Sequence, residues 1–179
     1  MPSTYRLSKV GRKLWTRDRA RTPREEVERL LESTEPGGTV TIDLRGVDVF
    51  DFSFAAEFFG RLLQRLPTEH AGRFLVVEHI GPWTGPNLQA TLEGLELAAI
   101  VRDEDDRYRL FGKVTETDRA TFEALAARGG RSTAAELASG LHVNLTAMNE
   151  RLQKLVGRGV LRREEAPGRA RFTYHTPQS

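Results

Sequence analysis

In the last third of the chain, apolar residues return every three or four positions, and this spacing predicts three consecutive helices. The first follows Thr115 or Thr117, either of which can cap it, and it ends at the glycine pair 129–130. The second begins at Thr133, where Glu136 three residues later completes a capping box. In such a box the hydroxyl and the carboxylate each accept one free backbone N–H, so the start of this helix is well defined.

The third helix of this region begins after Asn144, which can cap it, and it carries an apolar stripe on one side. The stripe consists of Met148, Leu152, Leu155 and Val156. Residues 160–165 and 169–175 then have the composition of two short strands. The turn 166–168 between them is Ala-Pro-Gly, in which proline presets φ and glycine tolerates positive φ. The pattern of this region therefore predicts three helices followed by a β-hairpin.

Before residue 113, segments with strand-like and helix-like patterns alternate. Strands are expected at 5–10, 13–16, 39–44, 47–50, 73–78 and 108–111, and helices at 22–31, 53–66 and 87–99. The helix at 22–31 has Pro23 in its first turn, where a missing N–H costs nothing. Strands that alternate with helices predict an α/β fold with a mixed or partly parallel sheet.

We therefore expect two small domains, an α/β domain over residues 1–112 and a helical domain with a hairpin over residues 113–179. The net charge of +2 conceals a strong division along the chain. Residues 1–24 hold eight Arg or Lys and one acid (+7), residues 25–112 eight and seventeen (−9), and residues 113–179 eleven and seven (+4). Both basic ends can meet nucleic acid, while the acidic middle stays away from it or receives a basic partner.

If the apolar stripe of the third helix is buried, four polar residues must face away from it. They are Thr146, Asn149, Glu150 and Gln153. Asn and Gln can pair with adenine, Thr can contact either base edge or a thymine methyl, and Glu can accept from cytosine N4. Because phosphates repel a carboxylate, Glu150 indicates either a cytosine contact or a helix that stays outside the groove of DNA.

Seven basic residues flank this surface and could meet phosphates or the minor groove. They are Arg151, Lys154 and Arg158 on the helix, and Arg162, Arg163, Arg169 and Arg171 on the hairpin. The alternative is that these are solvated charges on ordinary amphipathic elements.

The order ELA at 136–138, a turn, a helix with L-x-x-L-x-x-x-G at 152–159 and a basic hairpin resembles the winged helix-turn-helix domains of bacterial MarR-type and ArsR-type regulators. This resemblance implies double-stranded DNA as a partner. Winged helices also serve as protein-docking modules, so protein docking stays open. Winged-helix regulators commonly pair to read two half-sites, which keeps a homodimer open as well.

Residues 41–60, TIDLRGVDVFDFSFAAEFFG, resemble the core of STAS domains, which include the anti-sigma-factor antagonists, and more closely the bacterial STAS-like domains. The resemblance extends over residues 20–110 and implies a domain that docks a protein, such as a histidine-kinase-type ATPase. In the antagonists, a D-S-[ST]-G motif at the helix start carries a phosphorylatable serine. The matching positions here are Asp51, Phe52, Ser53 and Phe54, so Phe52 stands where that serine would be and Ser53 matches the adjacent hydroxyl.

The start of this helix has two interpretations. Asp51 or Ser53 can simply cap it, or a phosphate added to Ser53 would lie beside free backbone N–H groups. Five of the nine phenylalanines lie between residues 50 and 59. They cannot all lie on one side of a helix, so we expect one or two of them to form an exposed docking patch.

Several other functions find no support in the sequence. The chain has no Cys, which excludes disulfides and thiolate zinc sites. Its four His are scattered without the spacing or the nearby carboxylates of a metal site, and the acidic run 103–106 is expected to be a surface turn. Neither an apolar stretch of ~20 residues nor a signal peptide is present. We therefore expect a cytoplasmic protein without membrane contact, cofactor, metal or enzymatic activity.

Together these patterns predict a DNA-binding protein, in the role of a transcriptional regulator, with a STAS-like domain that senses a signal or docks a protein. The alternative is a protein-interaction adaptor in an anti-sigma-type or defence pathway, whose winged helix docks protein instead of DNA.

Overall fold

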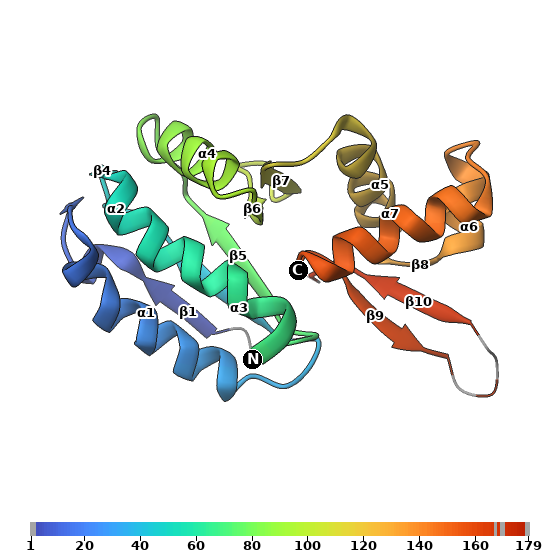
Figure 1. The fold of residues 1–179 in the computed structure, drawn as a ribbon, viewed down its shortest axis with the longest axis horizontal. Coiled ribbons are helices and arrows are strands. Elements are labelled where there is room, and N and C mark those ends of the chain that lie inside the picture. Colours follow the sequence, from blue (N-terminus) through green and yellow to red (C-terminus); the bar gives the residue numbers. More distant parts are fainter. Residues whose placement is uncertain (1–2, 167, 169–170, 178–179) are drawn as a thin grey trace.

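The computed structural model describes residues 3–166, 168 and 171–177, and Figure 1 shows the arrangement of its elements. The N-terminal unit consists of β1 (Ser3–Arg6), η1 (Leu7–Lys9), β2 (Lys13–Leu14), α1 (Arg17–Glu32), β3 (Thr39–Asp43), β4 (Val49–Phe50), α2 (Phe52–Ala55), the π-helical turn η2 (Ala56–Gly60), α3 (Arg61–Glu69), β5 (Phe74–Glu78), α4 (Thr84–Gly94), β6 (Ala98–Arg102) and β7 (Tyr108–Gly112). The C-terminal unit consists of α5 (Glu116–Ala127), β8 (Arg131–Thr133), α6 (Ala134–Gly140), α7 (Leu145–Gly157), β9 (Arg162–Glu165) and β10 (Phe172–His175).

A five-stranded sheet organises the N-terminal unit, with the strand order β1-β3-β5-β6-β7. The first four strands are parallel, and only β7 runs antiparallel, against β6. Every residue of β5 is buried, as expected for a central parallel strand that is covered on both faces. The expected α/β class with a mixed, largely parallel sheet is therefore confirmed.

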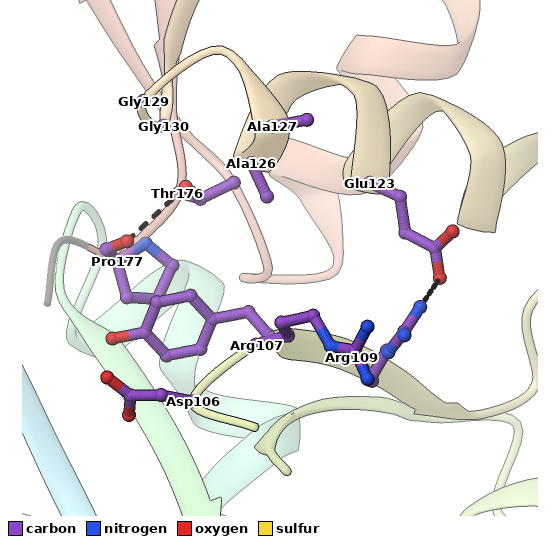
Figure 2. A pocket seen from close by; sticks show the side chains of 11 residues that line it. Asp106, Arg107, Arg109, Glu123, Ala126, Ala127, Gly129, Gly130, Thr176 and Pro177 are labelled. Carbon is purple, nitrogen blue, oxygen red and sulfur yellow. Dashed lines mark hydrogen bonds and ion pairs between the residues drawn. The ribbon is translucent and has the colours of Figure 1, made fainter. Parts of the chain in front are cut away.

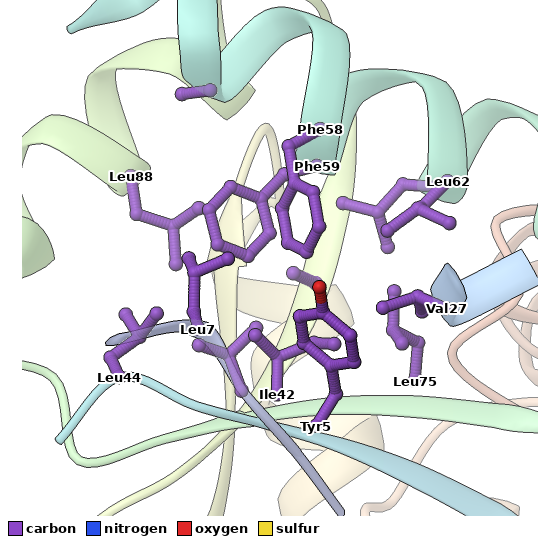
Figure 3. Close-up of a cluster of buried hydrophobic side chains, with 14 of the residues drawn as sticks. Tyr5, Leu7, Val27, Ile42, Leu44, Phe58, Phe59, Leu62, Leu75 and Leu88 are labelled. Atoms are coloured by element: carbon purple, nitrogen blue, oxygen red, sulfur yellow. The ribbon is translucent and has the colours of Figure 1, made fainter. Parts of the chain in front are cut away.

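One face of this sheet packs against α1, the α2–η2–α3 segment and α4. Figure 3 shows the centre of this core, where Phe58 and Phe59 lie against Leu62, Leu88 and residues of the strands. Four of the five clustered phenylalanines are fully buried. Phe52 is the exception, with 54% of its surface exposed. One of the five is therefore exposed, as expected, and its role in docking stays a prediction.

The other face of the sheet packs against the C-terminal unit. Alternate residues of β5 belong to two different cores: Leu75 and Val77 to the first, and Phe74 and Val76 to the second. The second core also contains residues from α5, α6, α7 and β10. The second core is therefore formed jointly by the two units, whereas the first belongs to the N-terminal unit alone.

The C-terminal unit has three helices and a three-stranded antiparallel sheet with the order β8-β10-β9. Its expected helix caps are confirmed: Thr115 caps α5, Thr133 forms the capping box with Glu136, and Asn144 caps α7. The capping box that Thr115 forms with Asp118 was not expected. The predicted stripe of α7 is buried, with Met148, Leu152 and Leu155 inaccessible and Val156 partly buried against them.

Several expected boundaries were wrong, and one strand was not expected. The strand expected over residues 5–10 ends at Arg6 and is followed by a 3-10 helix over Leu7–Lys9, and the helix expected from residue 87 begins at Thr84. α1 begins at Arg17 instead of residue 22, because buried residues at helical spacing start already at Ala20. The helix expected over 87–99 ends at Gly94, and residues 98–102 form β6, since a short apolar run is compatible with either element. β8 was not expected at all, because its three residues carry no apolar alternation of their own.

Among the described residues, none of the helices combines the length and the apolarity that crossing a bilayer demands.

Candidate nucleic-acid interface

A groove of about 430 Å³ lies between α7, the start of α6 and the β9–β10 hairpin. The residues that line it are Thr133, Ala134, Ala135, Leu145, Asn149, Gln153, Arg163, Arg171, Phe172 and Tyr174. In Figure 1, β9 and β10 extend away from the five-stranded sheet, and α7 runs alongside them. The structure thus brings together residues of the helix and the hairpin that are separated in the chain.

The buried stripe of α7 decides which of its side chains reach this groove. Leu145, Asn149 and Gln153 are spaced four residues apart, so they lie one above the other along one flank of the helix. Thr146 and Glu150 are exposed on the solvent side and do not line the groove. Of the four predicted base-reading residues, two therefore lie in the groove and two lie beside it.

Two of the predicted hairpin cations also line the groove. Arg163 extends over the ring of Phe172, with its Cζ 4.3 Å from the ring centroid, and Arg171 directly precedes β10. Neither residue takes part in an ion pair with another described residue. Arg169 lies outside the described residues.

Arg162 has a different environment from Arg163 and Arg171. Its side chain is 24% exposed, forms an ion pair of 3.2 Å with Glu164 and lies against Gly37 and Gly72 of the N-terminal unit. β9 thus begins in contact with the N-terminal unit, and only the residues that follow Arg162 are fully exposed.

The predicted helix cations lie on the flank of α7 that faces α5, away from the groove. The Nζ atom of Lys154 is 2.7 Å from a carboxylate oxygen of Asp118, which is 1% exposed, and Arg158 donates to the backbone carbonyl of Lys113. Burial alone would raise the pKa of Asp118, but the bonds from Lys154 and Thr115 together hold it below its usual value. Arg151 is half-buried on the same flank.

The start of α2 shows why Asp51 is a structural residue. Its carboxylate accepts the backbone N–H of Phe54 at 2.7 Å, and the second oxygen accepts the N–H of Thr16 at 3.3 Å. Thr16 has φ 71° and ψ 151°, a conformation that is unfavourable for a residue with a branched side chain. Phe54 is buried, Ser53 is half-buried, and Phe52 lies exposed at this corner of the molecule.

The strand, loop and helix around Asp51 lie inside a segment with a known relative. Residues 25–81 match the family described as STAS-like domain of unknown function (DUF4325). The N-terminal unit therefore contains a STAS-like domain. The matched segment runs from within α1 to just beyond β5 and includes the complete α2–η2–α3 helix. No curated protein and no solved structure matches the chain.

The carboxyl ends of the parallel strands of the STAS-like domain carry a cluster that the sequence reading missed. The Nδ1 atom of His79 is 2.9 Å from Asp43 and 3.6 Å from Glu78, so this histidine does have carboxylates nearby. Potential ligand atoms of the three residues all lie within 4.8 Å of one another. The sequence could have indicated this cluster by position alone, because Asp43 and Glu78 are the last residues of neighbouring parallel strands.

Every member of this cluster already has a partner within the protein. Asp43 pairs with Arg6 at 3.4 Å, and Glu78 pairs with Arg102. The guanidinium of Arg45 is 2.7 Å from Nε2 of His79. Because a guanidinium can only donate, Nε2 accepts and Nδ1 carries the hydrogen that Asp43 accepts. A metal ion would have to displace this hydrogen and compete with three arginines.

The pKa of Asp43 reflects the same network. Burial would raise it, but the backbone N–H of Arg45 and the bond from His79 outweigh burial and hold the pKa below its usual value. The carboxylate is therefore kept ionised by its internal donors.

A second hollow, of about 540 Å³, lies between β7, α5 and residues 176–177 (Figure 2). Its volume is in the range of small-molecule sites. At one side of it Arg109 bonds Glu123 at 2.7 Å, as Figure 2 shows. The other charged residues that line it also have partners, Asp106 in Arg102 and Arg107 in Asp103 and Asp105.

Proposed function

We propose that residues 113–177 form a winged helix-turn-helix that binds double-stranded DNA, and that the protein acts as a transcriptional regulator. In this proposal α7 is the recognition helix and β9–β10 is the wing. The STAS-like domain senses a signal or docks a protein, and the proposal assigns no catalytic step to the chain. The single observation that carries it is the groove in which Asn149 and Gln153 of α7 face Arg163 and Arg171 of the hairpin.

The element order supports the recognition role of α7. A winged helix requires two helices joined by a short turn, with the second helix exposed on one side and a hairpin beside it. Here α6 and α7 are joined by residues 141–144, and α7 is followed directly by the hairpin. A major groove admits one α-helix, and the part of α7 outside its buried stripe, including the flank with Asn149 and Gln153, is free to enter it.

Electrostatics supports a polyanionic partner for this face. Arg163 and Arg171 carry charges that no described carboxylate neutralises, in contrast to Lys154 and Arg158, which are held by the protein itself. Phosphate contacts supply most of the non-specific affinity for DNA, and each of them releases counterions. The hairpin arginines are therefore the phosphate contacts in this proposal, and Lys154 and Arg158 instead hold α7 against α5.

The STAS-like domain offers a separate surface to a protein partner, such as a kinase-type ATPase. Phe52 and Trp15 are exposed by 54% and 43% at the corner where α2 begins. Large exposed apolar side chains of this kind are typical of protein contacts. Because Asp51 already caps the helix, a phosphate on Ser53 would meet a carboxylate, so contact through Phe52 is the favoured role.

The test is the affinity for a labelled mixed-sequence duplex, measured by fluorescence anisotropy over a series of salt concentrations. The full chain should bind with an affinity that falls steeply with salt, by about one unit of log-log slope per contacted phosphate. The double variant Arg163→Ala/Arg171→Ala should weaken binding to every sequence and reduce this slope by about two units.

The matched control is Arg29→Ala/Arg61→Ala, which removes the same charge from exposed positions on α1 and α3. It should leave affinity and slope close to those of the parent protein. Equal losses in both variants would mean that net charge, and not the groove, governs binding, and the contact assignment would then be wrong.

The second candidate is a protein-docking role for the same face. Leu145 is 50% exposed and Phe172 is 39% exposed in the groove, and two carboxylates, Glu150 and Glu165, border the surface. A protein partner would use these apolar side chains and would require no salt-dependent contact with a duplex. Complete absence of duplex binding at low salt would favour this adaptor role.

A further inference from the structure

The groove flank of α7 presents a selective set of base-reading groups. Asn149 and Gln153 line it with two carboxamides four residues apart, and Leu145 lies one turn earlier on the same flank. A carboxamide pairs with adenine through N6 and N7, whereas guanine is read by Arg or Lys through O6 and N7. The flank therefore carries two groups suited to adenine.

The cations of α7 and of its C-cap lie away from the groove flank that carries the carboxamides. Arg151, Lys154 and Arg158 lie on the flank that faces α5, nearly opposite to Asn149 around the helix. Two of them are also engaged, Lys154 with Asp118 and Arg158 with the carbonyl of Lys113. No described Arg or Lys of α7 lines the groove.

Two further side chains favour the same kind of base pair. Leu145 is an exposed apolar group at the first position of α7, and the apolar group in the major groove of DNA is the thymine methyl. The arginines of the hairpin, Arg163 and Arg171, extend from an element that can reach a minor groove, and A·T runs have a narrow minor groove that attracts arginine.

We infer that this protein selects A·T-rich duplex DNA, with adenines read by Asn149 and Gln153 and a thymine methyl contacted by Leu145. This inference rests on the proposed DNA-binding function. It adds the class of sequence that is recognised, and it assigns the selection to α7 instead of to the hairpin alone.

The first experiment compares three duplexes of equal length at one salt concentration: A·T-rich, mixed and G·C-rich. The full chain should bind the A·T-rich duplex at least about tenfold more tightly than the G·C-rich one, as expected when even one carboxamide reads its base. In Asn149→Ala/Gln153→Ala, this ratio should fall towards one while the affinity for the G·C-rich duplex stays the same.

The matched control for this variant is Gln64→Ala, which removes an exposed carboxamide from α3. It should retain the full preference. The outcomes separate the two proposals: binding without preference, or preference for G·C, overturns the inference and leaves the DNA-binding function standing. Absence of binding to all three duplexes overturns both.

A duplex of inosine·cytosine pairs distinguishes the two grooves. Without the guanine N2 amino group, such a pair resembles A·T in the minor groove but presents the G·C pattern of O6 and N7 in the major groove. If α7 selects the sequence, the inosine duplex should bind about as weakly as the G·C-rich one. Binding as tight as to the A·T-rich duplex would mean that the hairpin alone selects the sequence, and it would overturn the role given to α7.

Replacing thymine with deoxyuridine in the A·T-rich duplex removes only the methyl groups. The parent protein should lose affinity on this change, about threefold to tenfold for a lost apolar contact. Leu145→Ala should show no further loss on the same replacement. Equal sensitivity of both proteins would contradict the contact assigned to Leu145.

Discussion

Arginines occur in two polar regions of this molecule and differ in what they contact there. At the carboxyl edge of the parallel sheet, Asp43 and Glu78 are buried, and each is paired with an arginine. In the groove beside α7, Arg163 and Arg171 have no carboxylate partner among the described residues. Charges that are neutralised internally stabilise the fold, whereas charges that remain free are available to a partner.

Removing Asp43 from the cluster at the carboxyl edge of the sheet should have the largest effect on stability. Asp43→Ala leaves Arg6, the N–H of Arg45 and Nδ1 of His79 without their common acceptor. Breaking a buried pair costs about 3–5 kcal/mol, and because the side chains of Arg6 and His79 are 64% and 41% exposed and can recover water, we expect a loss in the free energy of unfolding at the lower end, about 3 kcal/mol. Urea denaturation followed by circular dichroism measures it.

Asp48→Ala is the matched control, because Asp48 bonds Arg12 at 3.1 Å on an exposed surface. Its denaturation midpoint should hardly change. If Asp43→Ala and Asp48→Ala lost similar amounts of unfolding free energy, the buried position of Asp43 would not matter, and the distinction between the two sites would be wrong.

A smaller loss of unfolding free energy is expected when the contact between α7 and Asp118 of α5 is removed. Asp118→Ala removes both the capping-box partner of Thr115 and the acceptor of Lys154. Because Lys154 is 42% exposed and can recover water, we expect about 2–3 kcal/mol, made up of the lost cap and the buried acceptor. The variant should also bind DNA more weakly, since α7 loses a contact that sets its position, whereas Glu116→Ala in the same turn should change neither property.

The local features of the C-terminal unit could be predicted because each of them depends on a few neighbouring residues. The capping box of Thr133 with Glu136 and the buried stripe of α7 are examples. The edge cluster could not be predicted in the same way, because Asp43 and His79 are brought together by strand order and not by spacing. The resemblance of residues 41–60 to STAS domains identified the correct class, and the match over residues 25–81 supports it.

The candidate groove was only partly predictable for a related reason. Helical periodicity correctly placed Asn149 and Gln153 on the open side of α7. It could not show that Lys154 is paired with Asp118, or that Arg162 lies against Gly37, because both contacts join elements far apart in the chain. Basic residues look equivalent in a sequence until their partners are known.

Acid should destabilise the surroundings of Asp43 and Asp118 before it affects the groove beside α7. The pKa values of Asp43 and Asp118 are both held below the usual value by their donors, after the opposing effect of burial. A carboxylate with a lowered folded pKa contributes stability above its unfolded pKa of about 3.9, and this contribution is lost as the pH falls through the folded value. We therefore expect the denaturant concentration at the unfolding midpoint to decrease once the pH is lower than about 4. In Asp118→Asn this decrease should be less steep, and denaturation at a series of pH values measures it.

The smallest effect should come from neutralising the carboxylate beside the groove. Glu150 is exposed on the solvent side of α7, where the proposed DNA phosphates would repel it. Glu150→Gln should leave stability unchanged and raise the affinity for all duplexes by about twofold to fivefold at low salt, with the gain disappearing as salt increases. A loss of affinity confined to duplexes that contain cytosine would instead show that Glu150 accepts a hydrogen bond from cytosine N4, so that α7 also reads G·C pairs through this residue.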